Sequence, residues 1–220
     1  MQSDPEKRKT NAVHSRQTGR VFKQPSRMSR TAILVECAMM AALAFILSVI
    51  PFFHMPLGGS ITLFSTLPIV VVSFRHGAKW GMSTAAVYGI IQALQGANNV
   101  AAAGGFGAMV LCVLLDYFLS YSSVGLSGPI AGMIIRRKAK PVAGIAVGIA
   151  STGLMRLACS FISGMLIWGA WAPEGVAVWK YSLTYNAGWC LPDVAIVLVA
   201  ALALSRVTGA DIIPVGKART

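Results

Sequence analysis

Long apolar blocks separated by short polar segments dominate the sequence and predict a bundle of membrane helices. Six apolar runs occur, at residues 31–50, 61–74, 80–95, 106–135, 142–168 and 179–207. A helix needs roughly 20 apolar residues to cross a bilayer, so the second and third runs are short for that task. Short helices are tolerated where other parts of the protein shield them from lipid. We therefore predict an all-α fold, a polytopic membrane protein with a bundle of six transmembrane helices.

The apolar runs divide the chain into three parts: a basic arm at 1–30, the six-helix domain at 31–207, and a short tail at 208–220. The arm carries eight basic residues and lacks both an apolar core and a small-residue cleavage site, so it is not a secretory signal peptide. We expect the arm to be disordered, cytoplasmic and in contact with anionic lipid.

Composition and charge favour a membrane location and argue against a nucleic-acid partner. The chain is 55% apolar and 12% charged, whereas soluble domains carry about 25% charged residues. Seventeen of the 19 lysines and arginines fall in four segments, at 1–30, 75–79, 136–140 and 206–220. Uncharged connections alternate with these segments, which is the positive-inside pattern of membrane proteins. The net charge of +12 therefore reflects how the chain is oriented in the membrane, and it predicts that both termini lie in the cytoplasm.

Charged side chains within an apolar run are costly and mark functional positions. Asp116 lies in the fourth run, Arg156 in the fifth and Asp193 in the sixth. A lone carboxylate in hydrocarbon would take up a proton, so Asp116 needs a partner. Two arrangements stay open: either Arg156 pairs with an acid to hold helices together, or Asp116 faces a cavity and meets a cationic ligand.

The last two runs each carry a stripe of polar and aromatic residues. Residues about one turn apart share a helix face, and the two series are Arg156, Ser160, Gly164 and Trp168, and Ser182, Asn186, Trp189 and Asp193. Each hydroxyl alone is explained by a bond to its own helix backbone, and Asn186 by a bond between helices. Together, facing Asp116, the stripes favour a mostly apolar pocket with a few polar groups.

Four of the five tryptophans lie between Trp168 and Trp189, close to Tyr181 and Tyr185. One interpretation is an interfacial belt that anchors two helix ends. The other is a site for a flat, cationic ring system, because the quadrupole of an aromatic ring attracts positive charge.

The sequence contains no motif for catalysis or for energy use. Its four cysteines lie in apolar runs without metal-ligand spacing, and it has neither a GxxxxGK[ST] phosphate loop nor a GxSxG elbow. We therefore expect no enzyme activity, no metal and no cofactor.

Ala38 and Ala42 lie one turn apart on the first run. Small residues at this spacing let helix backbones approach closely in lipid. The pair either packs inside this chain or docks another membrane subunit.

Several segments resemble one transporter family. The most specific are Trp168-Gly-Ala-Trp-Ala-Pro-Glu-Gly and Tyr181-Ser-Leu-Thr-Tyr-Asn186 followed by Leu191-Pro192. Supporting segments are Glu36-Cys-Ala-Met-Met-Ala-Ala-Leu-Ala, Gly59-Ser60-Ile-Thr-Leu and Leu115-Asp116-Tyr117. Over residues 31–207 the chain resembles a substrate-capture (S) component of an energy-coupling-factor (ECF) vitamin transporter, most closely the thiamine-specific branch.

The resemblance implies a six-helix subunit in the cell membrane of a prokaryote. Such a subunit binds thiamine near the outer face, under the loop after the first helix. It releases thiamine inside when two ATPase subunits act through a transmembrane coupling subunit. The implied ligand-binding residues are Asp116, Tyr117, Phe106, Ser160, Gly164, Trp168, Tyr181 and Asn186, and the implied contacts with the coupling subunit are Ala38 and Ala42.

Two positions depart from the family pattern. Ser160 stands where the family has a ligand-contacting histidine, and Asp116 is one methylene shorter than the family's glutamate. A thiamine precursor or another heteroaromatic vitamin therefore stays open as the ligand. A less favoured alternative is a polytopic lipid-modifying enzyme that uses Asp116, Asp193 and Arg156, because the sequence offers no paired acids and no metal motif. A self-sufficient ion-coupled carrier would have more spans and an internal repeat.

Overall fold

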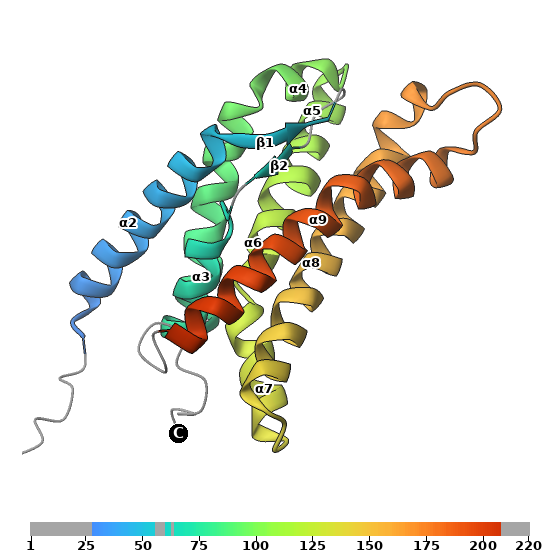
Figure 1. Ribbon diagram of the computed structural model, residues 1–220. Helices are drawn as coiled ribbons and strands as arrows, with labels where there is room; N and C mark the ends of the chain where they lie inside the picture. Colours follow the sequence, from blue (N-terminus) through green and yellow to red (C-terminus); the bar gives the residue numbers. More distant parts are fainter. Residues whose placement is uncertain (1–27, 56–59, 63, 208–220) are drawn as a thin grey trace, which may run out of the picture.

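The computed structural model describes residues 28–55, 60–62 and 64–207, which form a bundle of helices with one short hairpin (Figure 1). The expected all-α class is confirmed, and the antiparallel β1–β2 hairpin is an addition that the apolar pattern did not indicate. Most of the predicted arm and the whole tail lie outside the described residues. In chain order the elements are α2 (Arg30–Val49), β1 (Pro51–His54), β2 (Ser60–Thr62), α3 (Leu67–Gln95), α4 (Ala97–Ala102), α5 (Phe106–Cys112), the π-helix η1 (Val113–Leu119), α6 (Ser120–Val124), α7 (Ser127–Arg136), α8 (Pro141–Leu166), the 3₁₀-helix η2 (Trp168–Trp171) and α9 (Val178–Val207).

Within the described ranges, four helical stretches are long and apolar enough to cross a membrane. They are α2, the stretch Phe106–Val124 made of α5, η1 and α6, and the helices α8 and α9. On α2 the large apolar side chains of Leu34, Met39 and Ile46 are exposed on the surface of the bundle. Since lipid contacts such side chains without penalty, this surface fits a membrane protein.

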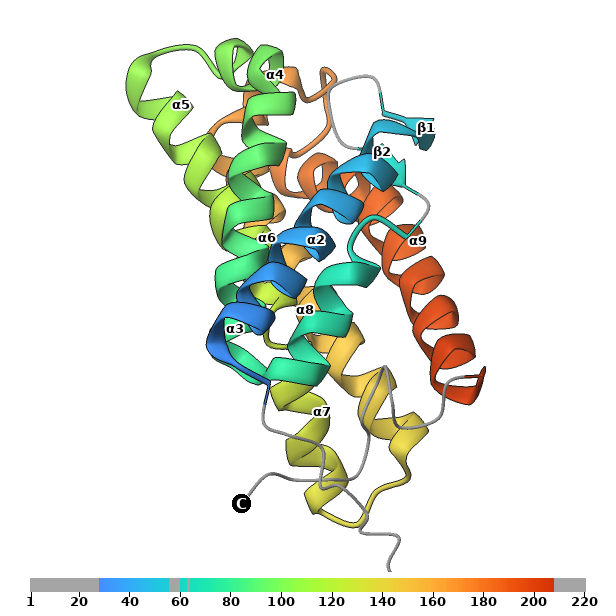
Figure 2. The ribbon, with the colours of Figure 1, turned by 90° about the vertical axis from the view of Figure 1, so that its left-hand side faces the viewer.

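The predicted break between the runs at 61–74 and 80–95 lies inside α3, where a sharp bend at Gly77 separates two helical limbs. Gly77 interrupts this element with φ 80° and ψ −171°, a backbone conformation that residues with a Cβ atom rarely adopt. The chain reverses there (Figure 2), and a Cβ atom on Gly81 would lie 2.9 Å from the Cα atom of Ser73. The first limb, 67–76, is therefore a half-length helix packed against the second limb, 78–95.

The run predicted at 106–135 is also divided. Its interruption was expected at Ser127-Gly128-Pro129, but the structure breaks the helix at Gly125 and Leu126. Pro129 lies in the first turn of α7, where backbone N–H groups have no acceptor within the helix, so that a proline costs no hydrogen bond. A Cβ atom on Gly125 would overlap the backbone of Gly81 and Met82, so the absence of a side chain lets α3 pack closely at this break.

The two ends of the bundle differ in charge. The start of α2, the bend of α3, the α7–α8 connection and the end of α9 lie at one end (Figures 1 and 2). These segments carry the basic residues at 75–79 and 136–140 and Arg206. The hairpin, α4 and η2 lie at the opposite end. The core in between is formed by Ala44, Ile69, Val70, Ala85, Tyr88, Val124, Ile145, Ile149, Val197 and Ala201.

Candidate ligand-binding site

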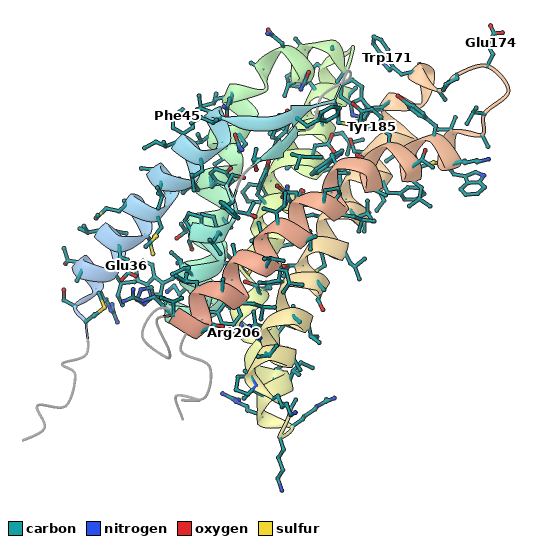
Figure 3. All side chains as sticks on the ribbon, viewed as in Figure 1. Glu36, Phe45, Trp171, Glu174, Tyr185 and Arg206 are labelled. Atoms are coloured by element: carbon teal, nitrogen blue, oxygen red, sulfur yellow. The ribbon has the colours of Figure 1, made fainter. Side chains whose placement is uncertain are left out.

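A cavity of about 480 Å³ opens among the hairpin, α2, α3, η1, α8, η2 and α9. This volume is in the range of small-molecule sites, which run from roughly 300 to 1,000 Å³. Trp171 and Tyr185 belong to its lining and lie at the hairpin end of the bundle (Figure 3). The cavity is therefore built at the end that does not carry the basic segments.

Seven of the eight ligand-binding residues expected from the sequence line this cavity: Asp116, Tyr117, Ser160, Gly164, Trp168, Tyr181 and Asn186. The structure does not bring Phe106 to them. Phe106 is the first residue of α5 and is 83% exposed, whereas the part of this stretch that lines the cavity begins at Cys112.

Asp116 lies in the π-helix η1, on the cavity wall. Short π-helical segments within α-helices are frequently found at functional sites. Three hydrogen bonds reach its Oδ2 atom, from Ser163 Oγ at 2.5 Å, Trp168 Nε1 at 3.4 Å and Cys112 Sγ at 3.6 Å. Within the described part of the chain, no lysine, arginine or histidine forms an ion pair with Asp116. Its carboxylate is thus held in place by neutral donors and is available to a cation.

Arg156 pairs with the other buried acid. Its Nη1 atom lies 2.9 Å from Asp193 Oδ2, and both side chains are buried. Thr62 Oγ1 donates to the second carboxylate oxygen of Asp193 at 3.1 Å, which ties the hairpin to α9. Of the two arrangements left open by the sequence, the structure shows Arg156 joined to Asp193 and, in addition, Asp116 facing a cavity.

The two predicted stripes meet along the α8–α9 contact, and all eight of their residues line the cavity. Asn186 Nδ2 donates to the Ser160 carbonyl at 3.1 Å, and Ser182 Oγ donates to the Phe161 carbonyl at 2.9 Å. A Cβ atom on Gly164 would overlap Ser182, so glycine is required for this close approach. The side chain of Asn186 therefore joins the two helices and also forms part of the cavity wall.

Sequence reasoning missed part of the polar lining. Ser163, the closest donor to Asp116, follows Ser160 by three residues, a spacing that places both on neighbouring faces of one helix. Gln92 and Gln95 also line the cavity, and their Oε1 atoms lie 3.5 and 3.2 Å from Ser48 Oγ. The presence of two glutamines near the end of the apolar run at 80–95 was the feature of the sequence that could have identified them as lining residues.

Ala38 and Ala42 are exposed on α2, whereas Cys37, Ala41 and Ala44 on the same helix are buried. The pair therefore lies on the outer face of the bundle. Internal packing, one of the two explanations offered for the spacing of Ala38 and Ala42, therefore does not account for these two small residues.

Fold and cavity together are those of a helical membrane protein with a pocket for a small molecule. The family described as thiamine transporter protein (Thia_YuaJ) matches residues 34–210. The chain therefore belongs to the thiamine transporter family, as the sequence motifs indicated.

Individual relatives agree with this assignment. The thiamine transporter ThiT of Bacillus subtilis (strain 168) is 34% identical over 167 residues, which cover 73% of this chain and 83% of that protein. The thiamine transporter ThiT of Lacticaseibacillus paracasei is 30% identical over 178 residues, with coverage of 76% and 83%. A solved structure of ThiT from Listeria monocytogenes has the same fold, with a TM-score of 0.66 and 24% identity over 84% of this chain and 98% of that chain. Membership of a transporter family also agrees with the expectation that the chain is not an enzyme.

Proposed function

We propose that this chain binds thiamine in the cavity described above and is the substrate-capture subunit of an ECF-type importer. The observation that carries the proposal is Asp116, an acid on an aromatic and polar cavity wall with no cationic partner among the described residues. Thiamine consists of two flat rings, one of them a positively charged thiazolium. The relatives named as thiamine transporters support the same ligand.

Asp116 would neutralise the charge of the thiazolium ring. Tyr117, Trp168 and Tyr181 supply aromatic faces to which a cationic ring is attracted. Gly164 sets the spacing between α8 and α9, and Ser160 and Asn186 complete the wall between them. The hairpin contributes Thr62 to the lining and forms the side of the site that connects to α2.

The proposed topology has six membrane-crossing segments with both termini in the cytoplasm. The half-length limb 67–76 and the hairpin before it together form the second crossing, and the limb 78–95 forms the third. This topology is supported by the positive-inside rule, because the basic segments gather at one end of the bundle. The cavity at the other end then faces the outside, where a nutrient arrives.

Ala38 and Ala42 would dock the transmembrane coupling subunit, through which two ATPase subunits drive uptake. An exposed pair of small residues permits close contact with another helix. Ala38→Trp and Ala42→Trp should therefore leave thiamine binding by the purified chain intact, yet abolish both co-purification of the coupling subunit and cellular uptake. Normal uptake by both variants would remove the docking role.

The ligand itself is tested by purifying the full chain in detergent and identifying small molecules that co-purify by mass spectrometry. We expect thiamine, and we expect added thiamine to quench tryptophan fluorescence because Trp168 lines the cavity. A second candidate is a thiamine precursor, favoured by the short hydroxyl of Ser160 at the position where the family carries histidine. Tighter binding of the separate pyrimidine moiety than of thiamine would support that candidate.

A further inference from the structure

The connection between α7 and α8 carries four positive charges within five residues. α7 ends at Arg136 and α8 begins at Pro141, and we call residues 136–140 the basic turn. Its cations, all of them exposed, are Arg136, Arg137, Lys138 and Lys140. Among the described segments, the basic turn extends furthest from the hairpin end of the bundle (Figures 1 and 2). It is therefore a charged surface well separated from the cavity.

Backbone hydrogen bonds and close packing hold the basic turn in one shape. The N–H group of Arg137 donates to the Ile134 carbonyl at 3.1 Å, and that of Lys138 donates to the Ile135 carbonyl at 2.9 Å. Lys138 has a positive φ of 63°, at the point where the chain reverses between the two helices. A Cβ atom on Gly144 would lie 2.5 Å from the Ile135 side chain, so α7 and α8 pack closely at the base of the turn. The cationic side chains are thus carried on a fixed backbone.

No acid among the described residues neutralises the basic turn. The ion pairs within the described ranges use Glu36 and Asp193 as acids, and the partners of both lie outside the turn. The other two described acids are remote, because Asp116 lines the cavity and Glu174 lies in the loop at the cavity end of the bundle (Figure 3). Four positive charges are therefore available to an anionic partner.

The surroundings of the basic turn place it at the edge of the hydrocarbon core. Met133 before the turn and Val142 after it are 57% and 45% exposed, so apolar surface continues up to the charges on both helices. α8 has 26 residues and is about 39 Å long at 1.5 Å per residue. This length exceeds the hydrocarbon core of about 30 Å but fits within the roughly 40–45 Å that include the headgroups. The start of α8 and the basic turn before it therefore lie at the level of the lipid headgroups.

We propose that the basic turn binds the phosphate headgroup of an anionic phospholipid of the phosphatidylglycerol type. Arg136 and Arg137 provide guanidinium groups, which bind phosphate oxygens in a bidentate manner, and the two lysines add positive charge. Clusters of arginine and lysine next to membrane helices are typical of such lipid sites. The exposed side chains of Met133 and Val142 favour a lipid over an acidic protein surface, because acyl chains cover them at the same time. The site is separate from the cavity, so its test does not depend on thiamine binding.

The test measures which lipids the full chain retains. The purified chain is reconstituted into nanodiscs of phosphatidylcholine with a minor share of phosphatidylglycerol, extracted in mild detergent and analysed by native mass spectrometry. The wild type should retain phosphatidylglycerol with an enrichment of at least about fivefold over the nanodisc composition, which corresponds to the contribution of about 1 kcal/mol from a single surface cation. A smaller enrichment overturns the proposal.

A pair of variants assigns the enrichment to the basic turn. The first variant replaces the four cations of the turn by glutamine and should retain phosphatidylglycerol only in proportion to its share of the nanodisc lipid. The control makes the same change at four exposed cations outside the turn, and these are Arg30, Lys79, Lys180 and Arg206. The control should keep the wild-type enrichment, and equal retention by the two variants overturns the assignment. Should the first variant fail to fold, Arg136→Gln with Arg137→Gln takes its place, and wild-type enrichment in this double variant overturns the proposal.

Photocrosslinking in cell membranes distinguishes a lipid from a protein as the occupant. Ala139, within the turn, is replaced by the photoreactive residue benzoylphenylalanine in the full chain, and the species attached after illumination is identified by mass spectrometry. We expect a phospholipid adduct that decreases when the four cations of the turn are replaced by glutamine. A protein adduct in its place, or a phospholipid adduct that does not respond to the loss of these charges, overturns the proposal.

Discussion

Asp116→Asn should weaken thiamine binding strongly, because it removes the one uncompensated charge among the described residues of the cavity wall and keeps the shape of the side chain. Two unit charges about 4 Å apart attract by about 4 kcal/mol at an effective dielectric constant of about 20. Asp116 is only half-buried, so solvent screening reduces this value. We expect a loss of roughly 2–3 kcal/mol, which corresponds to a roughly 30- to 150-fold increase in the dissociation constant.

The hydrogen bonds of Asp116 contribute little to this difference. An asparagine Oδ1 atom still accepts from Ser163 and Trp168, which now donate to the carboxylate. Charge is therefore the main quantity that changes. Asp116→Glu keeps the charge and is the matched control, expected to bind thiamine within about tenfold of the wild type.

Calorimetric titration of the purified chain, with two ligands, separates charge from shape. The first is thiamine, and the second is an analogue in which carbon replaces the thiazolium nitrogen, so that it is neutral but has the same outline. Asp116→Asn should change the affinity for the analogue far less than that for thiamine. Equal affinities of wild type and variant for thiamine, or equal losses for both ligands, would refute the role assigned to Asp116.

Three further changes have expected outcomes. Ser160→His should tighten thiamine binding in the same titration, since an imidazole fills space that the smaller hydroxyl group leaves empty. Weaker binding would contradict the presence of empty space beside residue 160. Gly164→Ala places a Cβ atom against a side chain of α9 and should cost about 1–3 kcal/mol of unfolding free energy. The matched Gly132→Ala meets no atom within 4 Å, so equal melting temperatures would contradict the packing described. In whole cells that express a cysteine-free variant of the protein, a cysteine introduced by Glu174→Cys should react with an impermeant maleimide and one introduced by Lys138→Cys should not. Labelling at position 138 would show that the orientation is the reverse of the proposed one.

Helical periodicity predicted much of the site because it fixes which residues share a face. Arg156, Ser160, Gly164 and Trp168 follow one another at four-residue steps, and all of them line the cavity. Periodicity does not say which stripe meets which. For that reason the pairing of Arg156 with Asp193, rather than with Asp116, emerged only in three dimensions.

Irregular backbone was beyond prediction for a different reason. The basic segment 75–79 did mark the break between the runs at 61–74 and 80–95, but nothing in the pattern showed that the first limb begins only at Leu67. The π-helical turn around Asp116 has no compositional mark, because the residues 113–119 are also those of an ordinary apolar helix. Most of the hairpin lies in the connection predicted between the first two runs, and only Ile61 and Thr62 belong to a run that was predicted to be helical.

The half-length limb 67–76 explains why the bundle is hollow at one end. A full-length helix in its place would continue through the volume that begins at Ser65, on the cavity wall. The pocket lies in the space that the second half of such a helix would occupy, and the hairpin fills part of that space. Changes in hairpin length or composition can thus alter the shape of the compartment while the surrounding helices keep their packing. The hairpin side of the pocket can thus vary by itself, whereas Gly164 and Asn186 on the helices serve both the pocket and the packing of α8 against α9.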